Sequence, residues 1–182
     1  MYSVVLSLGL ASIAAAVTQY VDSSTVVTGT MAGTGKNKIK DNKGATQFQG
    51  TPPYKDKDIQ LDFGSSKVVK SFYIDQKQIF SPPYAIMDVY IGDTPNTGSY
   101  TSSNTKCCSG CWWRGISSCD GTGRYMQFRM KNEANYWFYI ADILVFDTED
   151  KGSDGTLSIS GPPGAAYSVS VWRNLLKGSD KN

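Results

Sequence analysis

The chain has 182 residues, with 18 lysines and arginines against 16 acidic residues, so its formal net charge is only +2. It contains no histidine, which excludes serine–histidine and cysteine–histidine nucleophile pairs and histidine-ligated zinc. The small net charge offers no electrostatic footprint for nucleic acid, so no nucleic-acid partner is expected. The length predicts one domain with a hydrophobic core, and we expect a protein that is not an enzyme.

The N-terminal segment, residues 2–17, has no charged side chain, and three consecutive alanines end at Ala16. An apolar run of this length followed by small residues is typical of a secretory signal peptide. We therefore expect residues 1–16 to be cleaved and the mature protein to be extracellular. Two alternatives stay open: leucines alternate within the run, as in a retained apolar strand that pairs with a neighbouring subunit, or the segment is a short membrane anchor.

Short strand-like runs make up the middle of the chain. Apolar and polar residues alternate in residues 58–63, 87–91 and 125–130, whereas 68–74 alternates less cleanly and indicates a more buried strand. Residues 136–146 form a long apolar run with one acid, Asp142. Clusters of Gly, Pro, Asn and Ser separate them, and the loops are expected at 30–56, 75–84, 93–122 and 147–156. This pattern predicts an all-β antiparallel sandwich over residues 17–147.

The C-terminal extension, residues 148–182, begins with a linker-like composition of Gly, Ser, Pro and acidic residues. Alternation returns at Tyr167–Trp172 and predicts one further strand. The favoured interpretation is an edge strand of the same domain. The other interpretation is an extension that pairs with another chain.

Four cysteines lie within the expected loop at 93–122: Cys107, Cys108, Cys111 and Cys119. The spacing of Cys108 and Cys111 occurs in zinc sites, but Cys119 stands alone, whereas structural zinc sites usually supply a second close pair. Together with the secretory start, this favours two disulfides. Three connectivities are possible, including a bridge between the adjacent Cys107 and Cys108. Any of them would lock the loop.

Trp112, Trp113 and Arg114 lie inside the same loop. Adjacent residues of an extended chain point to opposite faces, so at least one tryptophan should reach the surface or a subunit contact. Tryptophan offers a flat apolar face to a sugar ring, and arginine offers a planar fork of donors to hydroxyls or carboxylates. Local packing beneath the disulfides and insertion into a membrane surface are the alternatives.

Four segments occur in the order seen in discoidin-like domains: IQLDFGSSKVVKSFYI, MDVYIGD, CDGTGRYMQFRM and YIADILVFD. The chain resembles the galactose-binding-like sandwiches of fucolectins and coagulation-factor C-type domains over about residues 38–147. Its most specific match is Cys119–Tyr125. The resemblance implies an eight-stranded jelly roll that binds ligands with loops at one end.

The resemblance also implies site residues. Lys77 and Tyr84, on the expected loop at 75–84, would join the tryptophan loop in ligand binding. A structural calcium ion would take Asp41 and Asp142 as ligands. Arg124 falls on a framework position of the family.

The function expected from these features is a secreted carbohydrate-binding, lectin-like module whose partner is a glycan or glycoprotein. The alternative is a structural subunit of an extracellular filament or matrix, a homo-oligomer that assembles through residues 2–17 and 156–172. Binding to a membrane surface is the third expectation.

Overall fold

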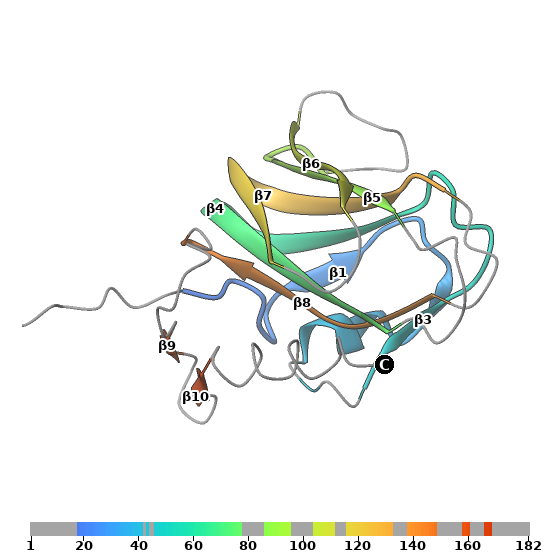
Figure 1. The fold of residues 1–182 in the computed structure, drawn as a ribbon, viewed down its shortest axis with the longest axis horizontal. Helices are drawn as coiled ribbons and strands as arrows, with labels where there is room; N and C mark the ends of the chain where they lie inside the picture. The colour runs from blue at the N-terminus through green and yellow to red at the C-terminus, as the bar shows by residue number, and fades with distance from the viewer. Residues whose placement is uncertain are drawn as a thin grey trace, which may run out of the picture.

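The structure is a computed structural model (Figure 1). It describes residues 18–41, 43, 46–77, 86–95, 104–111, 116–132, 138–148, 158–160 and 166–168. The predicted signal peptide therefore lies outside the described residues. In the described part of the chain, no helix is long and apolar enough to cross a membrane.

The described residues form ten strands and one short 3-10 helix, η1. They are β1 (Val26–Thr28), β2 (Gly33–Thr34), η1 (Lys36–Lys40), β3 (Phe48–Gly50), β4 (Asp58–Lys77), β5 (Met87–Gly92), β6 (Thr105–Cys111), β7 (Ile116–Met130), β8 (Phe138–Phe146), β9 (Ser158–Ser160) and β10 (Ala166–Ser168). The all-β antiparallel fold class is thereby confirmed.

Eight strands form one continuous hydrogen-bonded sheet in the order β2-β3-β8-β4-β7-β5-β6, and β1 pairs with β4. Every pairing is antiparallel. The first part of β4 pairs with β1 and β7, residues 71–73 pair with both β7 and β8, and residues 74–77 pair with β8. The sheet therefore turns back on itself along β4, and Figure 1 shows β5, β6 and β7 on one side of β4 with β8 and β3 on the other.

The turn in β4 lies between Asp62 and Lys67, where the ladder with β7 shifts register. Gly64 adopts φ 76 there, a conformation that favours glycine, and its amide donates to Asp62 Oδ1 at 2.8 Å. The sequence predicts two strands, at 58–63 and 68–74, with Gly64-Ser65-Ser66 between them. The structure forms a single strand, β4, because the ladder with β7 resumes at Lys67 after the register shift.

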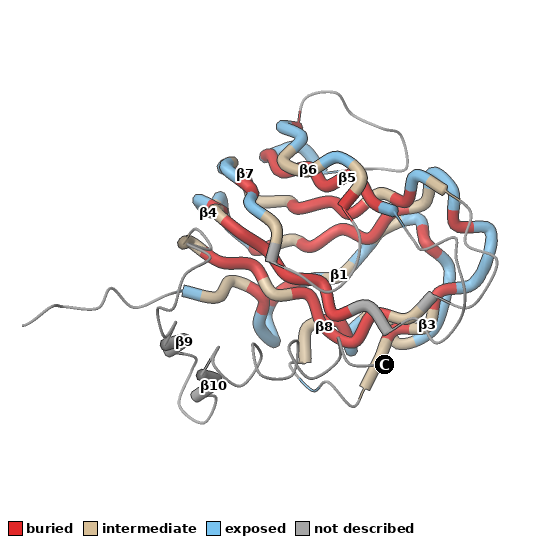
Figure 2. Tube along the Cα trace, in the orientation of Figure 1, coloured by how far each residue is buried: buried red, intermediate tan, exposed pale blue. Residues whose placement is uncertain are grey.

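The core lies between the two halves of the sheet (Figure 2). It contains the inward residues of the alternating runs: Ile59, Leu61, Phe72, Ile74, Met87, Val89, Ile91, Met126, Phe128, Ile140, Ile143 and Val145. Phe72 and Phe128 meet edge to face, with their ring centroids 5.8 Å apart. The alternation of residues 58–63, 87–91 and 125–130 thus predicted the inward residues of these segments.

The expected loop boundaries were partly wrong. Short elements β2, η1 and β3 lie inside 30–56, and β4 continues through residues 75–77, which pair with β8. Most of 105–122 is strand as well, in β6 and β7. β6 is the last strand in the sheet order, and its sequence TKCCSGC lacks the apolar–polar alternation from which a half-buried strand is predicted.

The expected edge strand in the C-terminal extension is also corrected. Within the described residues, β10 pairs only with β9, and the two form a separate antiparallel sheet. The strand spans Ala166–Ser168, whereas residues 169–182 lie outside the described part.

Candidate functional site at one end of the sandwich

Four connections between strands each have at least one described flanking residue at one end of the sandwich, called here the β4–β5 end. They are residues 51–57, 78–86, 112–115 and 131–137. Their placement follows from the register. At this end Met87 pairs with both Cys111 and Met130, and Gly50 pairs with Phe138.

Hydrogen bonds between these connections close the end. The Ile86 amide donates to Asn132 Oδ1 at 3.0 Å, and the Lys131 amide donates to the Ile86 carbonyl at 2.8 Å. The Asp56 amide donates to the Met130 carbonyl at 3.0 Å. The described flanks of three separate connections are thus held together by backbone and amide contacts.

Of the five predicted ligand residues, the structure describes Lys77 alone. Tyr84, Trp112, Trp113 and Arg114 lie outside the described residues. Among their described neighbours, Ile86 directly precedes β5, Cys111 ends β6 and Ile116 begins β7. Lys77 was expected in a loop, but it is the last residue of β4 and pairs with Tyr139 of β8, because the ladder extends past the bulge at Asp75.

A polar network joins β5, β6 and the residue after β7. Its centre is the carboxylate of Asp88, whose side chain is only 10% exposed. Lys106 Nζ lies 2.8 Å from Asp88 Oδ2, and Lys131 Nζ lies 3.4 Å from Oδ1. The Gly110 amide donates to Oδ1 at 2.9 Å, and the Ser109 hydroxyl donates to it at 3.2 Å. One buried acid therefore fixes three segments beside the β4–β5 end.

The electrostatics of this network follow from its contacts. Burial alone would raise the pKa of Asp88, but the hydrogen bonds from Lys106 and the Gly110 amide, with the charges of both lysines, lower it to about 2. The hydrogen bond from Asp88 in turn raises the pKa of Lys106. Lys106 also lies over the Tyr90 ring, 5.2 Å from its centroid. Asp88 is therefore ionised at neutral pH, and the group is cationic on balance.

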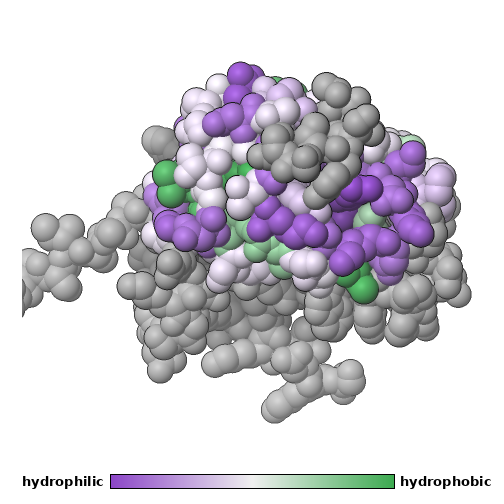
Figure 3. All heavy atoms as spheres, turned by 90° about the horizontal axis from the view of Figure 1, so that it is seen from above, coloured by the Kyte–Doolittle hydropathy of each residue, from purple (hydrophilic) through white to green (hydrophobic). Residues whose placement is uncertain are grey.

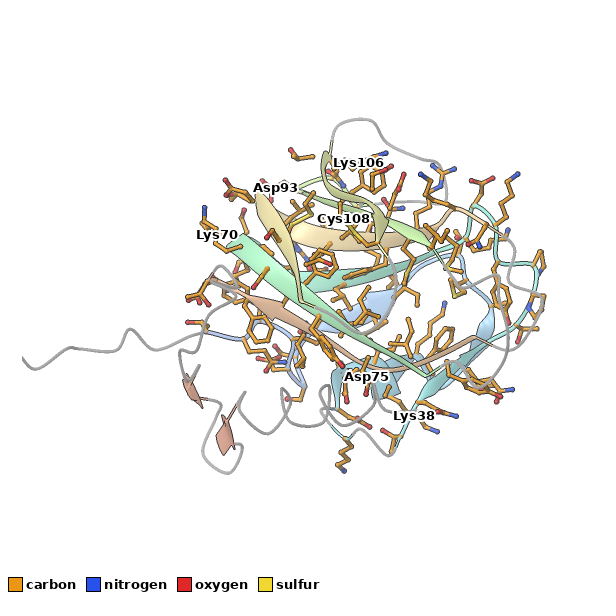
Figure 4. The ribbon with its side chains drawn as sticks, viewed as in Figure 1. Lys38, Lys70, Asp75, Asp93, Lys106 and Cys108 are labelled. Atoms are coloured by element: carbon orange, nitrogen blue, oxygen red, sulfur yellow. A yellow bond between two sulfur atoms is a disulfide. The ribbon has the colours of Figure 1, made fainter. Side chains whose placement is uncertain are left out.

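This part of the surface is hydrophilic. Figure 3 shows mostly hydrophilic side chains on the face seen from above, the side on which β5, β6 and β7 lie. Figure 4 shows Lys106 and Cys108 close together on β6 at the top of the molecule. Ile86, 37% exposed, is an apolar residue beside this polar surface. Its Cγ2 atom lies 3.7 Å from the place that a Gly110 side chain would occupy.

All four cysteines are paired: Cys107 with Cys119, and Cys108 with Cys111. The bridge between the adjacent Cys107 and Cys108 is therefore not formed. The expectation that the cysteines occupy a loop is wrong, since three lie on β6 and Cys119 lies on β7. The first disulfide ties two strands together across the core, and the second closes a four-residue ring at the end of β6.

The turn after η1 carries part of the donor set that the predicted calcium ion needs. Asp41 accepts hydrogen bonds from the Lys43 amide at 3.0 Å and the Thr46 hydroxyl at 2.6 Å. That hydroxyl also lies 3.1 Å from the Lys43 carbonyl. Carboxylate, carbonyl and hydroxyl oxygens suit calcium, which takes roughly six to eight of them. Within the described residues, however, no three His, Cys, Asp or Glu residues gather as a metal site, and calcium stays a prediction.

Asp142, the second predicted calcium ligand, is 1% exposed on β8. It pairs with Asp75, itself 8% exposed, beside a register shift in the β4–β8 ladder. Asp142 therefore lies inside the fold, next to a second acid.

The Asp88 network was missed by the sequence analysis. Asp88 reads as an ordinary outward residue between two buried ones, and its lysine partners are 18 and 43 positions away. Contacts of this kind depend on strand order, which alternation does not encode. The only local signal was the lysine directly before Cys107.

Comparison with known proteins gives the fold a name. No protein-family model and no curated protein matches the chain, but solved structures do. A family 32 carbohydrate-binding module (CBM32) from NanJ of Clostridium perfringens, in complex with galactose, shares 12% identity at a TM-score of 0.54, over 71% of this chain and 98% of that one. The CBM32 of AlyQ, in complex with 4,5-unsaturated mannuronic acid, shares 19% identity at a TM-score of 0.52, over 72% and 99%.

A third match is CpGH89CBM32-5 of Clostridium perfringens, in complex with GalNAc-β-1,3-galactose. It shares 12% identity at a TM-score of 0.55, over 70% of this chain and 99% of that one. These likenesses show the fold, which is the discoidin-like, galactose-binding-like β-sandwich of CBM32 domains. The resemblance and the predicted jelly-roll architecture are confirmed at that level.

Proposed function

We propose that this chain, which has the fold of the CBM32 domains, is a non-enzymatic carbohydrate-binding module that binds a glycan at its β4–β5 end. The observation that carries the proposal is that described residues flanking four connections meet at that end. By sequence, two of these connections contain the tryptophan–arginine segment and Tyr84. Solved neighbours with this fold are complexes with galactose, an unsaturated mannuronic acid and a GalNAc-containing disaccharide.

Physical arguments support this end over the rest of the surface. A sugar ring needs a flat apolar surface and several fixed donors. The sequence supplies two tryptophans and an arginine at residues 112–114. The described residues beside them supply the ammonium groups of Lys106 and Lys131, which Asp88 holds in place.

The proposed setting is extracellular. Four paired cysteines are typical of an oxidising compartment, and residues 1–16 have the pattern of a secretory signal. A glycan or glycoprotein on a surface outside the cell is the partner that this setting favours.

A glycan array probed with the full chain tests the proposal, followed by calorimetric titration with the best hit. The panel should include galactose, GalNAc-terminated and uronate-containing oligosaccharides. We expect Trp112→Ala and Trp113→Ala to lower the affinity at least about 10-fold, because stacking area is lost. Val68→Ala, at an exposed apolar residue near the turn in β4, is the matched control and should bind normally. If no glycan binds, or if both tryptophan variants bind as the control does, the proposal is wrong.

A further inference from the structure

We propose that the Cys108–Cys111 disulfide is a thiol–disulfide exchange site, and that opening it releases the turn from which the 112–115 connection departs. The partner is a dithiol reductant. The exchange itself does not depend on the proposed function, and only its effect on glycan binding rests on it.

The two disulfides of the chain differ in what they hold. Cys107–Cys119 spans two strands, and Cys119 is 1% exposed in the core. Cys108–Cys111 closes a ring over only two intervening residues, Ser109 and Gly110. A short ring constrains the unfolded chain less than a long one, so opening it leaves the fold largely intact.

The ring is also placed where a reductant can reach it. It lies at the end of β6, the last strand in the sheet order. Cys108 is partly exposed, and Cys111 is 6% exposed. Thiol–disulfide exchange needs access to a sulfur atom, and the partly exposed Cys108 offers one. Cys107 of the other disulfide is partly exposed as well, so the two bridges differ in the size of the ring that each closes and in what that ring holds.

Contacts with Asp88 couple the ring to the β4–β5 end. Both residues inside the ring donate to Asp88 Oδ1, the Gly110 amide at 2.9 Å and the Ser109 hydroxyl at 3.2 Å. Gly110 adopts φ 70, and the ladder between β5 and β6 shifts register on both sides of Val89. The closed ring therefore fixes an irregular turn against a buried carboxylate. Cys111, which closes the ring after Gly110, pairs with Met87. It is the last residue before the 112–115 connection.

The dithiol reductant supplies the two electrons for the exchange in two steps. One thiolate of the dithiol attacks the Cys108 sulfur, the bond to Cys111 breaks, and Cys111 leaves with the electron pair and takes up a proton. The second thiolate of the reductant then attacks its own sulfur in the mixed disulfide and releases Cys108, which is protonated in turn. The reductant ends as a disulfide, and the protein gains two electrons and two protons.

The first test is a titration of the full folded chain with dithiothreitol, followed by alkylation and peptide mapping. We expect Cys108 and Cys111 to be labelled at reductant concentrations at least about 10-fold below those that label Cys107 and Cys119. Simultaneous labelling of all four, or earlier labelling of Cys107 and Cys119, overturns the exchange site. The labelling of the cysteines does not involve a glycan, so its result is independent of the proposed function.

The second test measures the coupling. In C108S/C111S, hydrogen exchange of the Gly110 and Ile116 amides should become at least about 10-fold faster, while the amides of Ile59 and Phe128 in the core keep their protection. Ser109→Ala, which removes one hydroxyl and leaves the ring closed, is the matched control and should change exchange far less. Unchanged exchange at Gly110 and Ile116 in C108S/C111S overturns the coupling, and circular dichroism shows whether the variant is folded.

Discussion

Arg124 of β7 forms a two-pronged ion pair with Asp62 of β4: Nε lies 2.6 Å from Oδ1, and Nη2 lies 2.8 Å from Oδ2. The hydrogen bond from Arg124 is the main cause of the lowered pKa of Asp62. Asp62 also accepts the amide of Gly64 in the turn of β4. The pair therefore fastens this turn to the neighbouring strand.

Replacing Arg124 tests the role of the fork. Lysine keeps the charge but cannot make two parallel hydrogen bonds, so Arg124→Lys should lower the melting temperature, and Arg124→Ala should lower it further. The control is Lys70→Ala, which breaks a 2.6 Å pair with Asp120, whose side chain is 82% exposed. A pair of that kind contributes little, and its loss should leave the melting temperature nearly unchanged. A wild-type melting temperature for Arg124→Lys would show that the second hydrogen bond does not matter.

The stability of the protein should fall in strong acid because of Asp88. Its folded-state pKa of about 2 lies below its usual value of 3.8. A lowered carboxyl pKa stabilises the fold above the unfolded value, and this contribution is lost as the pH falls from about 4 to 2. We expect a loss on the order of 1–2 kcal/mol over that window, from urea unfolding at pH 5, 3 and 2.

The variant Asp88→Asn isolates this contribution, since asparagine keeps the shape of the side chain without its charge. The variant should be less stable than the wild type at pH 5, and the difference should shrink toward pH 2. A constant difference across the window would mean that the carboxylate charge is not responsible.

Close packing between β5 and β7 requires glycine at position 123. A side-chain carbon there would meet the backbone of Gly92, and backbone atoms cannot move aside as a flexible side chain does. We expect Gly123→Ala to cost about 2–3 kcal/mol in unfolding free energy.

Gly64→Ala is the comparison, because nothing lies within 4 Å of its added carbon and only its φ of 76 is unfavourable. It should cost about 1 kcal/mol. Chemical denaturation of both variants gives their unfolding free energies. Equal losses would show that a shift of β5 relieves the contact between position 123 and Gly92.

Calcium binding at the Asp41 turn is tested by melting the chelated protein with and without added calcium. If the ion binds there, its addition raises the melting temperature, because a ligand that binds only the folded state stabilises it. Asp41→Asn should abolish the shift. Asp56→Asn, at an exposed acid away from the turn, should retain it. If added calcium leaves the melting temperature of the wild type unchanged, the prediction of a bound calcium ion is wrong.

Alternation predicted the core residues of β4, β5 and β7 correctly, since burial on one face leaves a period of two in the sequence. It failed where position in the sheet matters more than pattern. The edge strand β6 carries cysteines, Ser and Gly in place of an apolar row, and its disulfides provide the contacts that apolar residues provide elsewhere.

The candidate site was predictable only in part. The family resemblance indicated which loops meet at one end, and the register places their flanks there. The Asp88 network could not be predicted from the sequence, because it brings together Lys106 of β6 and Lys131, the residue after β7, through the order of the strands.

β4 belongs to both halves of the sandwich, through its pairing with β1 and β7 at one end and β8 at the other. Neither half can lose this strand without exposing the apolar face of the other. The domain should therefore unfold in a single cooperative transition, so that damage at the turn of β4 weakens the loops at the far end as well.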